Sequence, residues 1–380
     1  MRLLLPPVGL IAAALAISPV LKPQDEEQAN IIKDLAKTNK LDFWYPDATH
    51  HVAANMTVDF RVGEKESQAI QSALDQNKMH YKILIHDLQE EVDKQFDVKE
   101  DIPGRHSYAK YNTWDKTEKM VHKRPEMVSR IKIGTTAEDN PLYVLKIGKK
   151  DERRKAIFMD CGIHAREWIS PAFCQWSVYQ ATKTYGKNKI MTKLLDQMNF
   201  YVLPVFSVDG YIWSWTQILK NRSKNQDSQC IGTDLNRNFD VSWNCEETKA
   251  VTDFIRSHLK SIKAHITFHS YSQMLLFPFG YTSDLPPNHE DLVCREKSMI
   301  YALTPPLAFR LFLHTSTIYP TSGSSLDWAY ILSIKHTFAF ELREKGKFGF
   351  LLAESRIKST CKETMLAVKF IAKYILKHTS

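Results

Sequence analysis

The stretch KAIFMDCGIHAREW, residues 155–168, decides the fold and points to the chemistry of this chain. Its first seven residues are mostly apolar, which is typical of a strand buried on both faces of a sheet. This run leads into Gly162, and His164 and Glu167 follow it, spaced three residues apart. In open sheets covered by helices, functional sites form beyond the carboxyl ends of strands. We therefore expect a site just after Cys161.

Similar strands recur between residue 102 and the end of the chain, which leads to a fold prediction. The expected strands alternate with segments of helical periodicity near 170–185, 189–197, 246–260 and 361–377. The other strand candidates are SRIKIG, LYVLKIG, FYVLPVF, AHITFHS, QMLLFPF and HTFAFEL. Several of them are apolar almost throughout, so helices must cover both faces of the sheet. The prediction is an α/β fold, a helix-sheet-helix sandwich around a mixed, mostly parallel sheet.

Two further strands end in residues that suit a metal. The run AHITF leads into His269, and TFAF leads into Glu341. Two histidines and one glutamate form a set that catalytic zinc uses while one coordination position stays open. The residues alone leave other interpretations open. An H-x-x-E pair can be a surface pair, a histidine at a strand end can be simply hydrogen-bonded, and Glu341 can pair with Arg343.

The charge of the chain is divided unevenly between its two parts. The 380 residues sum to +8, but residues 1–101 hold 11 basic and 17 acidic side chains, and the remaining 279 residues hold 40 basic and 26 acidic ones. The N-terminal part therefore has a net charge of −6 and the rest +14. A hydrophobic fraction of 43% with only 13 glycines excludes a disordered or collagen-like chain. An acidic module before a basic body indicates a pro-segment that masks a cleft, with a freestanding acidic domain as the alternative.

Three segments follow from this division. Residues 1–16, with Arg2, a short apolar run and a small-x-small end, predict a signal peptide. The run is too short to span a bilayer, which makes a membrane anchor the weaker interpretation. Residues 17–101 predict a small α/β pro-segment, with strands at LDFWYP, MTVDFRV and HYKILIH and helices at ESQAIQSALDQ and HDLQEEVDKQF. Residues 102–380 form the main domain.

Secretion would place the six cysteines in an oxidising compartment. Two pairs are close enough in sequence to be candidates for local disulfides, Cys161 with Cys174 and Cys230 with Cys245. Cys294 and Cys361 are left without an assignment.

Six longer motifs now identify a family. The stretches HAREWISPAFC, PVFSVDGY, GTDLNRNF, ITFHSYSQ, TIYPTSGSSLDW and FAFELREKGKFGFLL together resemble the secreted zinc carboxypeptidases of the carboxypeptidase A/B family, and the resemblance extends over nearly the whole chain. Carboxypeptidase A is itself a standard example of a two-histidine, one-glutamate zinc site, so the resemblance and the ligand pattern are not independent.

The resemblance implies an activity and its machinery. The chain would be the secreted zymogen of a metallocarboxypeptidase, acting on the C-termini of peptides and proteins and inhibited by its own pro-segment. One Zn²⁺ per chain would be held by His164, Glu167 and His269. Glu341 would be the general base, since zinc lowers the pKa of a bound water to about 7 and a nearby carboxylate can move the proton.

The resemblance also implies the residues that bind the substrate. Asn236 and Arg237 would hold its terminal carboxylate, which a guanidinium group matches with two hydrogen bonds. Tyr319 would close over the bound residue. Leu326 would form the floor of the side-chain pocket, where an apolar residue favours aromatic or large aliphatic side chains over Lys and Arg. More distant subsites, with packing alone as the alternative role, would involve Arg166, Tyr271 and Phe350.

Some segments depart from the family pattern. Leu219 stands where the family has an arginine that stabilises the developing oxyanion, and losing such a donor typically costs about 10²–10³ in turnover. The run VSWNCEETKAV lacks a family loop, and residues 292–314 lose the expected helix-and-strand pattern. Such clustered losses are typical of an altered transcript. They motivate a second hypothesis, a zinc-binding but catalytically impaired secreted protein that binds glycosaminoglycan. A structural secreted domain without metal is a third.

Charge and export predict the partners and the location. A body of +14 favours binding to a heparin-like sulfated proteoglycan, with an affinity that falls as salt rises. No nucleic-acid partner is expected, because secretion separates the protein from nucleic acid and no recognition motif is present. The protein is expected outside the cell or in a secretory granule, with no membrane anchor.

Overall fold

A computed structural model describes residues 17–46, 48–95, 106–118, 126–151, 153–214, 232–239, 245–292, 310–313, 319–346 and 348–379. The chain forms two compact units. One is N-terminal, extends to residue 96 and includes 347–351, and the other comprises the rest. The predicted signal peptide at 1–16 lies outside the described residues. Among the helices that are described, none combines the length and the apolar character needed to cross a membrane.

The N-terminal unit contains a four-stranded sheet in the order β2-β3-β1-β4, with every pair antiparallel. Its core is apolar and includes Ile32, Phe60 and Ile70, all fully buried. The predicted strands and helices are present. The sequence prediction missed β1, which is four residues long and contains a proline, and also missed α1. The elements are β1 (Ser18–Leu21), α1 (Glu26–Thr38), β2 (Asp42–Tyr45), η1 (Thr49–His51), β3 (Val58–Arg61), α2 (Glu64–Gln76), β4 (Tyr81–Ile85) and α3 (Leu88–Gln95).

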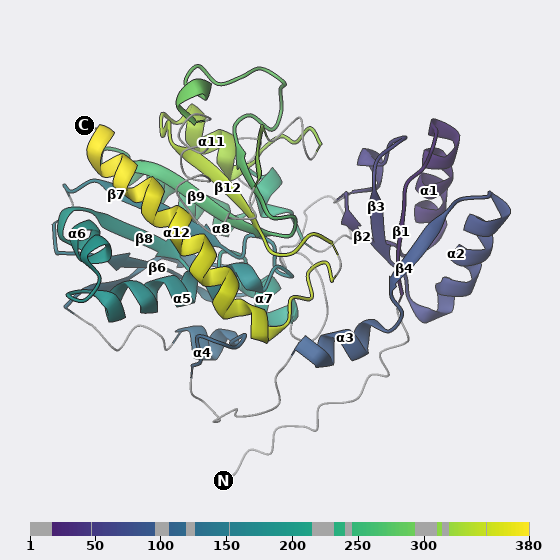
Figure 1. The fold of residues 1–380 in the computed structure, drawn as a ribbon, viewed down its shortest axis with the longest axis horizontal. Coiled ribbons are helices and arrows are strands. Elements are labelled where there is room, and N and C mark those ends of the chain that lie inside the picture. The colour runs from purple at the N-terminus through teal and green to yellow at the C-terminus, as the bar shows by residue number, and fades with distance from the viewer. Residues whose placement is uncertain are drawn as a thin grey trace, which may run out of the picture. The chain divides into compact units, whose positions relative to one another are not determined.

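The larger unit is built on an eight-stranded sheet in the order β11-β10-β12-β9-β7-β8-β6-β5 (Figure 1). The four adjacent strands β12, β9, β7 and β8 are all parallel, and so are β10 and β11, whereas the other three pairs are antiparallel. The predicted mixed, mostly parallel sheet is therefore confirmed. The strands are β5 (Val128–Thr135), β6 (Pro141–Ile147), β7 (Ala156–Cys161), β8 (Asn199–Leu203), β9 (Ile262–Ser270), β10 (Met274–Phe277), β11 (Arg310–Leu313) and β12 (Thr337–Leu342).

Helices cover both faces of this sheet (Figure 1). One face carries α5 (Ile169–Thr184), α6 (Lys189–Gln197) and α12 (Glu354–His378), which contact one another. The other face carries α8 (Glu246–Ser257) and α11 (Ser325–Ile331), which contact β5 and β12 respectively. The short elements of this unit are α4 (Trp114–Glu118), α7 (Val208–Ser214) and η3 (Leu235–Arg237).

The central strands are apolar because successive side chains enter two different cores. On β7, Phe158 packs against Phe254 of α8 with ring centroids 6.0 Å apart. The next residue, Met159, points the other way and lines a small cavity with Ala181 of α5 and Met365 of α12. The helix-sheet-helix sandwich is confirmed, and both layers hold the ends of β7, β9 and β12 in place.

One strand was not expected from the sequence. The prediction was that residues 292–314 lose the family's regular pattern, yet β11 lies in that range and pairs with β10, with Leu275 opposite Leu311. Four residues bounded by irregular sequence give too short a pattern for periodicity to detect. Edge pairing with β10 supplies the backbone hydrogen bonds that make the segment a strand.

A buried carboxyl group in the larger unit makes stability depend on pH. Glu247, in the first turn of α8, is 0% exposed. Burial raises its pKa from 4.5 to about 7, the nearby charges of Asp209 and Glu246 add to this, and the backbone N–H groups of Glu247 and Ala137 oppose it. The folded state therefore prefers a proton there that the unfolded chain releases above pH 4.5.

We expect Glu247 to make the protein less stable as the pH rises from about 4.5 to about 7. A shift of this size corresponds to about 3 kcal/mol in the free energy of unfolding, present at low pH and lost once the pH exceeds the folded pKa. The isosteric variant Glu247→Gln should lack this loss. Unfolding of both proteins in the zinc-free form at pH 5 and pH 8 tests it, and an equal pH dependence in the two would contradict the prediction.

Candidate metal centre

The structure brings the three predicted metal ligands together. His164 and Glu167 lie in the turn between β7 and α5, and His269 lies next to last in β9. Their ligand atoms are all within 4.8 Å of one another. Nδ1 of His164 is 2.8 Å from Oε1 of Glu167, and Nδ1 of His269 is 3.2 Å from both Oε2 of Glu167 and Nδ1 of His164. Four atoms thus face one small space.

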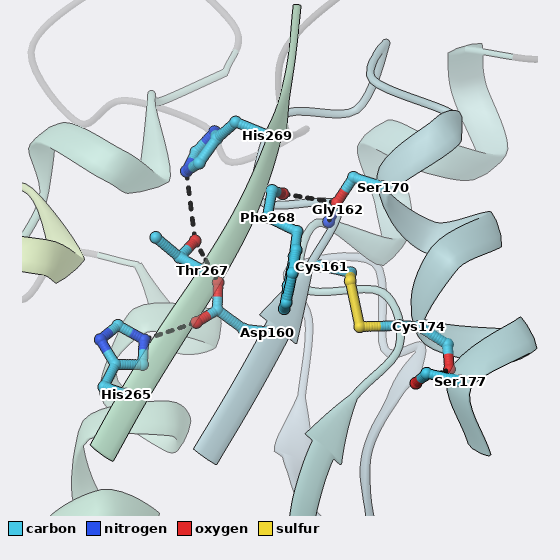
Figure 2. Close-up of a disulfide and its surroundings, with 10 residues drawn as sticks. All are labelled: Asp160, Cys161, Gly162, Ser170, Cys174, Ser177, His265, Thr267, Phe268 and His269. Carbon is cyan, nitrogen blue, oxygen red and sulfur yellow. Dashed lines mark hydrogen bonds and ion pairs between the residues drawn. A yellow bond between two sulfur atoms is a disulfide. The ribbon is translucent and has the colours of Figure 1, made fainter. Parts of the chain in front are cut away.

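The turn that carries His164 and Glu167 is fixed at both ends. Gly162 has a φ of +67°, and a side chain there would place a Cβ 2.8 Å from Pro171, so the position requires glycine. Its N–H donates to Oγ of Ser170 at 3.0 Å. A disulfide between Cys161 and Cys174 joins the end of β7 to α5 (Figure 2). This predicted pair is confirmed, and both ligands lie inside the loop that it closes.

The other predicted pair stays a prediction, because Cys230 lies outside the described residues. Cys245 is buried at the N-terminus of α8. Cys361, within α12, is a buried free thiol, and burial raises its pKa far above the ordinary value.

The ligand set concentrates charge where a cation would bind. Burial lowers the pKa of His164, but the negative charges of Glu167 and Asp234 outweigh it and raise that pKa to about 10. Burial raises the pKa of Glu167, but the charges of His164 and His269 outweigh it and lower that pKa to about 2. Without a metal, the proton on His164 balances the carboxylate. A metal that took its place would release this proton on binding.

The outward-facing atoms of the two histidines are also bonded. Nε2 of His164 lies 3.2 Å from Oδ1 of Asp234, and Nε2 of His269 lies 3.2 Å from Oγ1 of Thr267. Each ring can therefore present Nδ1 to the shared space. There both oxygens of Glu167 face an imidazole nitrogen, Oε1 that of His164 and Oε2 that of His269. Two imidazole nitrogens that converge on one buried carboxylate fit zinc.

Glu341 lies beside this centre on the next strand. On the parallel strands β12 and β9 its Cα is the register partner of that of His269. Burial and the negative charge of Glu167 raise its pKa well above the ordinary value, opposed by the charge of His164. The alternative of a salt bridge with Arg343 is wrong, since the guanidinium of Arg343 donates instead to Glu363, with Nε 2.9 Å from Oε2.

The predicted substrate residues Asn236, Arg237 and Leu326 lie on two segments that are bonded to each other. Oδ1 of Asn236 accepts from the backbone N–H of Ser325 at 3.0 Å, at the start of α11. Gly323 has a φ of +73° and approaches Arg237 so closely that a Cβ would lie 2.6 Å from its carbonyl oxygen. Leu326, one residue after Ser325, is 2% exposed and belongs to an apolar cluster with Leu276 and Ala339.

The roles of four other predicted residues stay predictions. Arg166 is in the same turn as His164, Tyr271 follows the end of β9, and Tyr319 precedes α11; all three are half-buried and belong to the larger unit. Phe350 belongs instead to the segment that groups with the N-terminal unit, where its ring packs edge-on against Trp44 with centroids 5.3 Å apart.

Three polar residues of this region were missed from the sequence: Asp160, Asp234 and Thr267. Asp160 is the one acidic residue in the apolar run of β7, and Thr267 lies between His265 and His269 at a spacing of two. A polar residue repeated on one face of a buried strand is the signal that identifies them, because such groups need partners. Asp234 lies two residues before Asn236 in the motif that was assigned to substrate binding.

Comparisons with known proteins agree with this geometry. A family model described as zinc carboxypeptidase matches residues 114–367, and one described as carboxypeptidase activation peptide matches residues 20–95. The chain belongs to the zinc carboxypeptidase family. It is 73% identical to mast cell carboxypeptidase A of Homo sapiens over 418 aligned positions covering 100% of each chain, and 46% identical to carboxypeptidase B of Bos taurus over 384 positions covering 93% of this chain and 92% of that one.

A solved structure extends the likeness to the whole fold. Thrombin-activatable fibrinolysis inhibitor matches with a TM-score of 0.89 and 35% identity, over 96% of this chain and 100% of that one. With its activation peptide, this chain is the zymogen of a zinc carboxypeptidase. The second hypothesis, a catalytically impaired binding protein, is not favoured by these relatives. The sulfated-polysaccharide partner expected from the charge stays a prediction.

This zinc carboxypeptidase is shorter than its human relative within the aligned region. The alignment spans 418 positions, whereas the chain has 380 residues, so at least 38 positions of the relative have no counterpart here. The departures seen in the sequence agree with this. Leu219 and the segment 240–244 lie outside the described residues, so the effect of the absent arginine stays a prediction.

The disulfide should stabilise the turn that carries two ligands. Cys161 and Cys174 are 13 residues apart and both fully buried. Replacing both by alanine should lower the free energy of unfolding by about 2–4 kcal/mol, the usual effect of opening a loop of this size. Thermal unfolding of the zinc-free chain measures it. Replacing Cys361 by alanine is the matched control for losing a buried cysteine, and an equal loss in both would contradict the prediction.

Proposed function

We propose that this zinc carboxypeptidase is secreted and that, once activated, it removes aromatic or large aliphatic residues from the C-termini of peptides and proteins with one zinc ion per chain. The observation that carries the proposal is the convergence of His164, Glu167 and His269, with Glu341 in register beside His269. The family gives the reaction class, and these side chains would supply a ligand set and a proton carrier at the carboxyl edge of one sheet.

His164, Glu167 and His269 would hold the zinc. Bound there, zinc would polarise the scissile carbonyl as a Lewis acid and make a water molecule more acidic. The outward hydrogen bonds of His164 to Asp234 and of His269 to Thr267 support this role, because a hydrogen bond at Nε2 fixes the orientation of the ring whose Nδ1 would bind the metal.

Glu341 would move the proton. Its carboxylate would accept a proton from the attacking water and then donate it to the nitrogen of the leaving residue. Burial raises the pKa of this carboxyl group, which favours holding the proton between the two steps. Its position on the strand next to His269 supports this assignment over a structural one, as Arg343 is engaged by Glu363.

Asn236 and Arg237 would bind the terminal carboxylate of the substrate. A planar guanidinium group matches a carboxylate with two parallel hydrogen bonds, and this contact would restrict the enzyme to chain ends. In the structure, Nη1 of Arg237 donates to the carbonyl oxygen of Asn236 at 3.0 Å. The side chain of Asn236 is held through its Oδ1, which accepts from the backbone N–H of Ser325. These bonds orient both side chains from the protein side.

Leu326 would set the side-chain preference. Its neighbours Leu276 and Ala339 are apolar, so a substrate cation would find no buried partner in this cluster. The adjacent acid, Asp327, is committed elsewhere, because its two oxygens accept from the N–H of Gly280 at 3.0 and 2.9 Å. The pocket floor therefore suits an apolar C-terminal side chain.

Removing the carboxylate of Glu341 tests the reaction. The proteolytically matured protein should hydrolyse a blocked dipeptide that ends in Phe, and a zinc chelator should abolish this activity. Glu341→Gln should lower turnover by about 10²–10⁴-fold, the usual contribution of a general acid-base group, with zinc content unchanged. Turnover equal to that of the unaltered enzyme in Glu341→Gln, or hydrolysis that survives complete zinc removal, would refute the proposed role.

The preference for apolar residues is tested with two matched substrates. The value of kcat/KM should be higher for a dipeptide ending in Phe than for one ending in Lys by about 100-fold or more, since an unpaired buried cation costs several kcal/mol. Leu326→Asp should reverse the order, and Leu326→Ile is the control that should keep it. Faster hydrolysis of the Lys substrate by the unaltered enzyme would contradict the assignment.

A further inference from the structure

A buried chain of hydrogen bonds connects His269 to Asp160, across β9 and β7 (Figure 2). Nε2 of His269 lies 3.2 Å from Oγ1 of Thr267, and that hydroxyl donates to Oδ1 of Asp160 at 2.7 Å. The other oxygen of Asp160 lies 2.6 Å from Nε2 of His265. Asp160, Thr267 and His265 are each 1% exposed, so water does not compete for these bonds.

The chemistry of the groups fixes the direction of each bond. The hydroxyl of Thr267 has a single hydrogen, and it donates that hydrogen to Oδ1 of Asp160. The oxygen of Thr267 can then only accept, and the group that faces it is Nε2 of His269, which must carry a hydrogen. A neutral imidazole with its hydrogen on Nε2 has a lone pair on Nδ1. Nδ1 is the atom of His269 that faces Glu167 and His164.

Strand register is what makes the chain possible. Asp160 and Thr267 are Cα partners on the parallel strands β7 and β9, and Thr267 and His269 lie on the same face of β9 because they are two residues apart. Two donors reach Asp160 from β9, which is what a carboxylate removed from water requires. The polar groups are therefore placed by backbone pairing and need no flexible loop.

The two histidines of the centre are held by different hydrogen-bond arrangements. His164 faces the carboxylate of Asp234 directly, and both of these side chains are partly exposed, at 29% and 16%. His269 reaches a carboxylate only through the hydroxyl of Thr267, entirely within the sheet. Both hydrogen-bond arrangements leave Nδ1 of the histidine available. Two separate carboxylates, those of Asp234 and Asp160, therefore select the same tautomer, with the hydrogen on Nε2.

We propose that Thr267 and Asp160 are positioning residues for zinc: Asp160, acting through the Thr267 hydroxyl, holds His269 in the tautomer whose Nδ1 can bind the metal. The inference rests on the proposed assignment of His269 as a zinc ligand. Without the hydroxyl, Nε2 of His269 has no acceptor, and the hydrogen is free to move to Nδ1, where it blocks the metal.

The test is the zinc dissociation constant of the full, unactivated chain, measured by competition with a chelator. Thr267→Val keeps the shape and removes the hydroxyl, and it should weaken zinc binding by about 10–100-fold, the usual effect of losing an outer hydrogen bond to a ligand. Thr267→Ser keeps the hydroxyl and should bind zinc as the unaltered chain does.

Thr337→Val is the matched control. Thr337 lies on the adjacent strand β12, its Cα is the partner of that of His265, and its side chain is 0% exposed. Its hydroxyl makes no hydrogen bond to the described residues, so replacing it should leave zinc affinity unchanged. Thermal unfolding of the zinc-free variants identifies any loss that comes from the fold alone.

Asp160→Asn tests the other member of the chain. If Asp160 acts through Thr267, the double variant Asp160→Asn/Thr267→Val should bind zinc no more weakly than the weaker of the two single variants. Multiplying losses would refute the role of Asp160. Unchanged affinity in Thr267→Val, or an equal loss in Thr337→Val, would overturn the role of Thr267. Failure of the unaltered chain to bind one zinc would instead refute the proposed function.

Discussion

The register of three neighbouring parallel strands, β7, β9 and β12, is the constraint on which the site depends. Phe268, next to the proposed ligand His269, is paired with Cys161, and His269 itself is paired with Glu341. Parallel strands end at a common edge, so residues more than a hundred positions apart in sequence meet there. A shift of one residue in either pairing would turn His269 or Glu341 to the opposite face of the sheet.

The arrangement of the polar side chains near the carboxyl edge of the sheet follows from the exclusion of water from its two faces. Both faces are covered by helices, so a polar group on the central strands is stabilised by partners within the protein. Asp160 accepts from Thr267 and is bonded to Nε2 of His265, and His269 lies on the same face of β9, closer to the edge. Beyond the edge, the turn closed by Cys161 and Cys174 carries the other two proposed ligands, His164 and Glu167. The resulting cluster of imidazoles around one buried carboxylate is a stable arrangement when a cation or protons balance the charge.

Much of this could be predicted from the sequence, because the deciding signals are local. Apolar runs of strand length predicted the strands, the three that end in a cysteine, a histidine or a glutamate predicted the edge where the site lies, and long motifs indicated the family. What could not be predicted depends on pairing between distant strands. The strand β11 exists because β10 lies beside it, and the link from Asp160 to His269 requires knowing that Asp160 is opposite Thr267. Periodicity in one segment carries no information about its partner.

The claim that His164, Glu167 and His269 hold one zinc ion is tested most directly by X-ray absorption at the zinc edge. The measurement uses the full chain stripped of metal and reloaded with one equivalent of zinc. We predict two imidazole nitrogens at about 2.0–2.1 Å and carboxylate oxygen at about 2.0–2.2 Å, with no sulfur ligand. A sulfur ligand at about 2.3 Å, or a chain that retains no zinc, would contradict it.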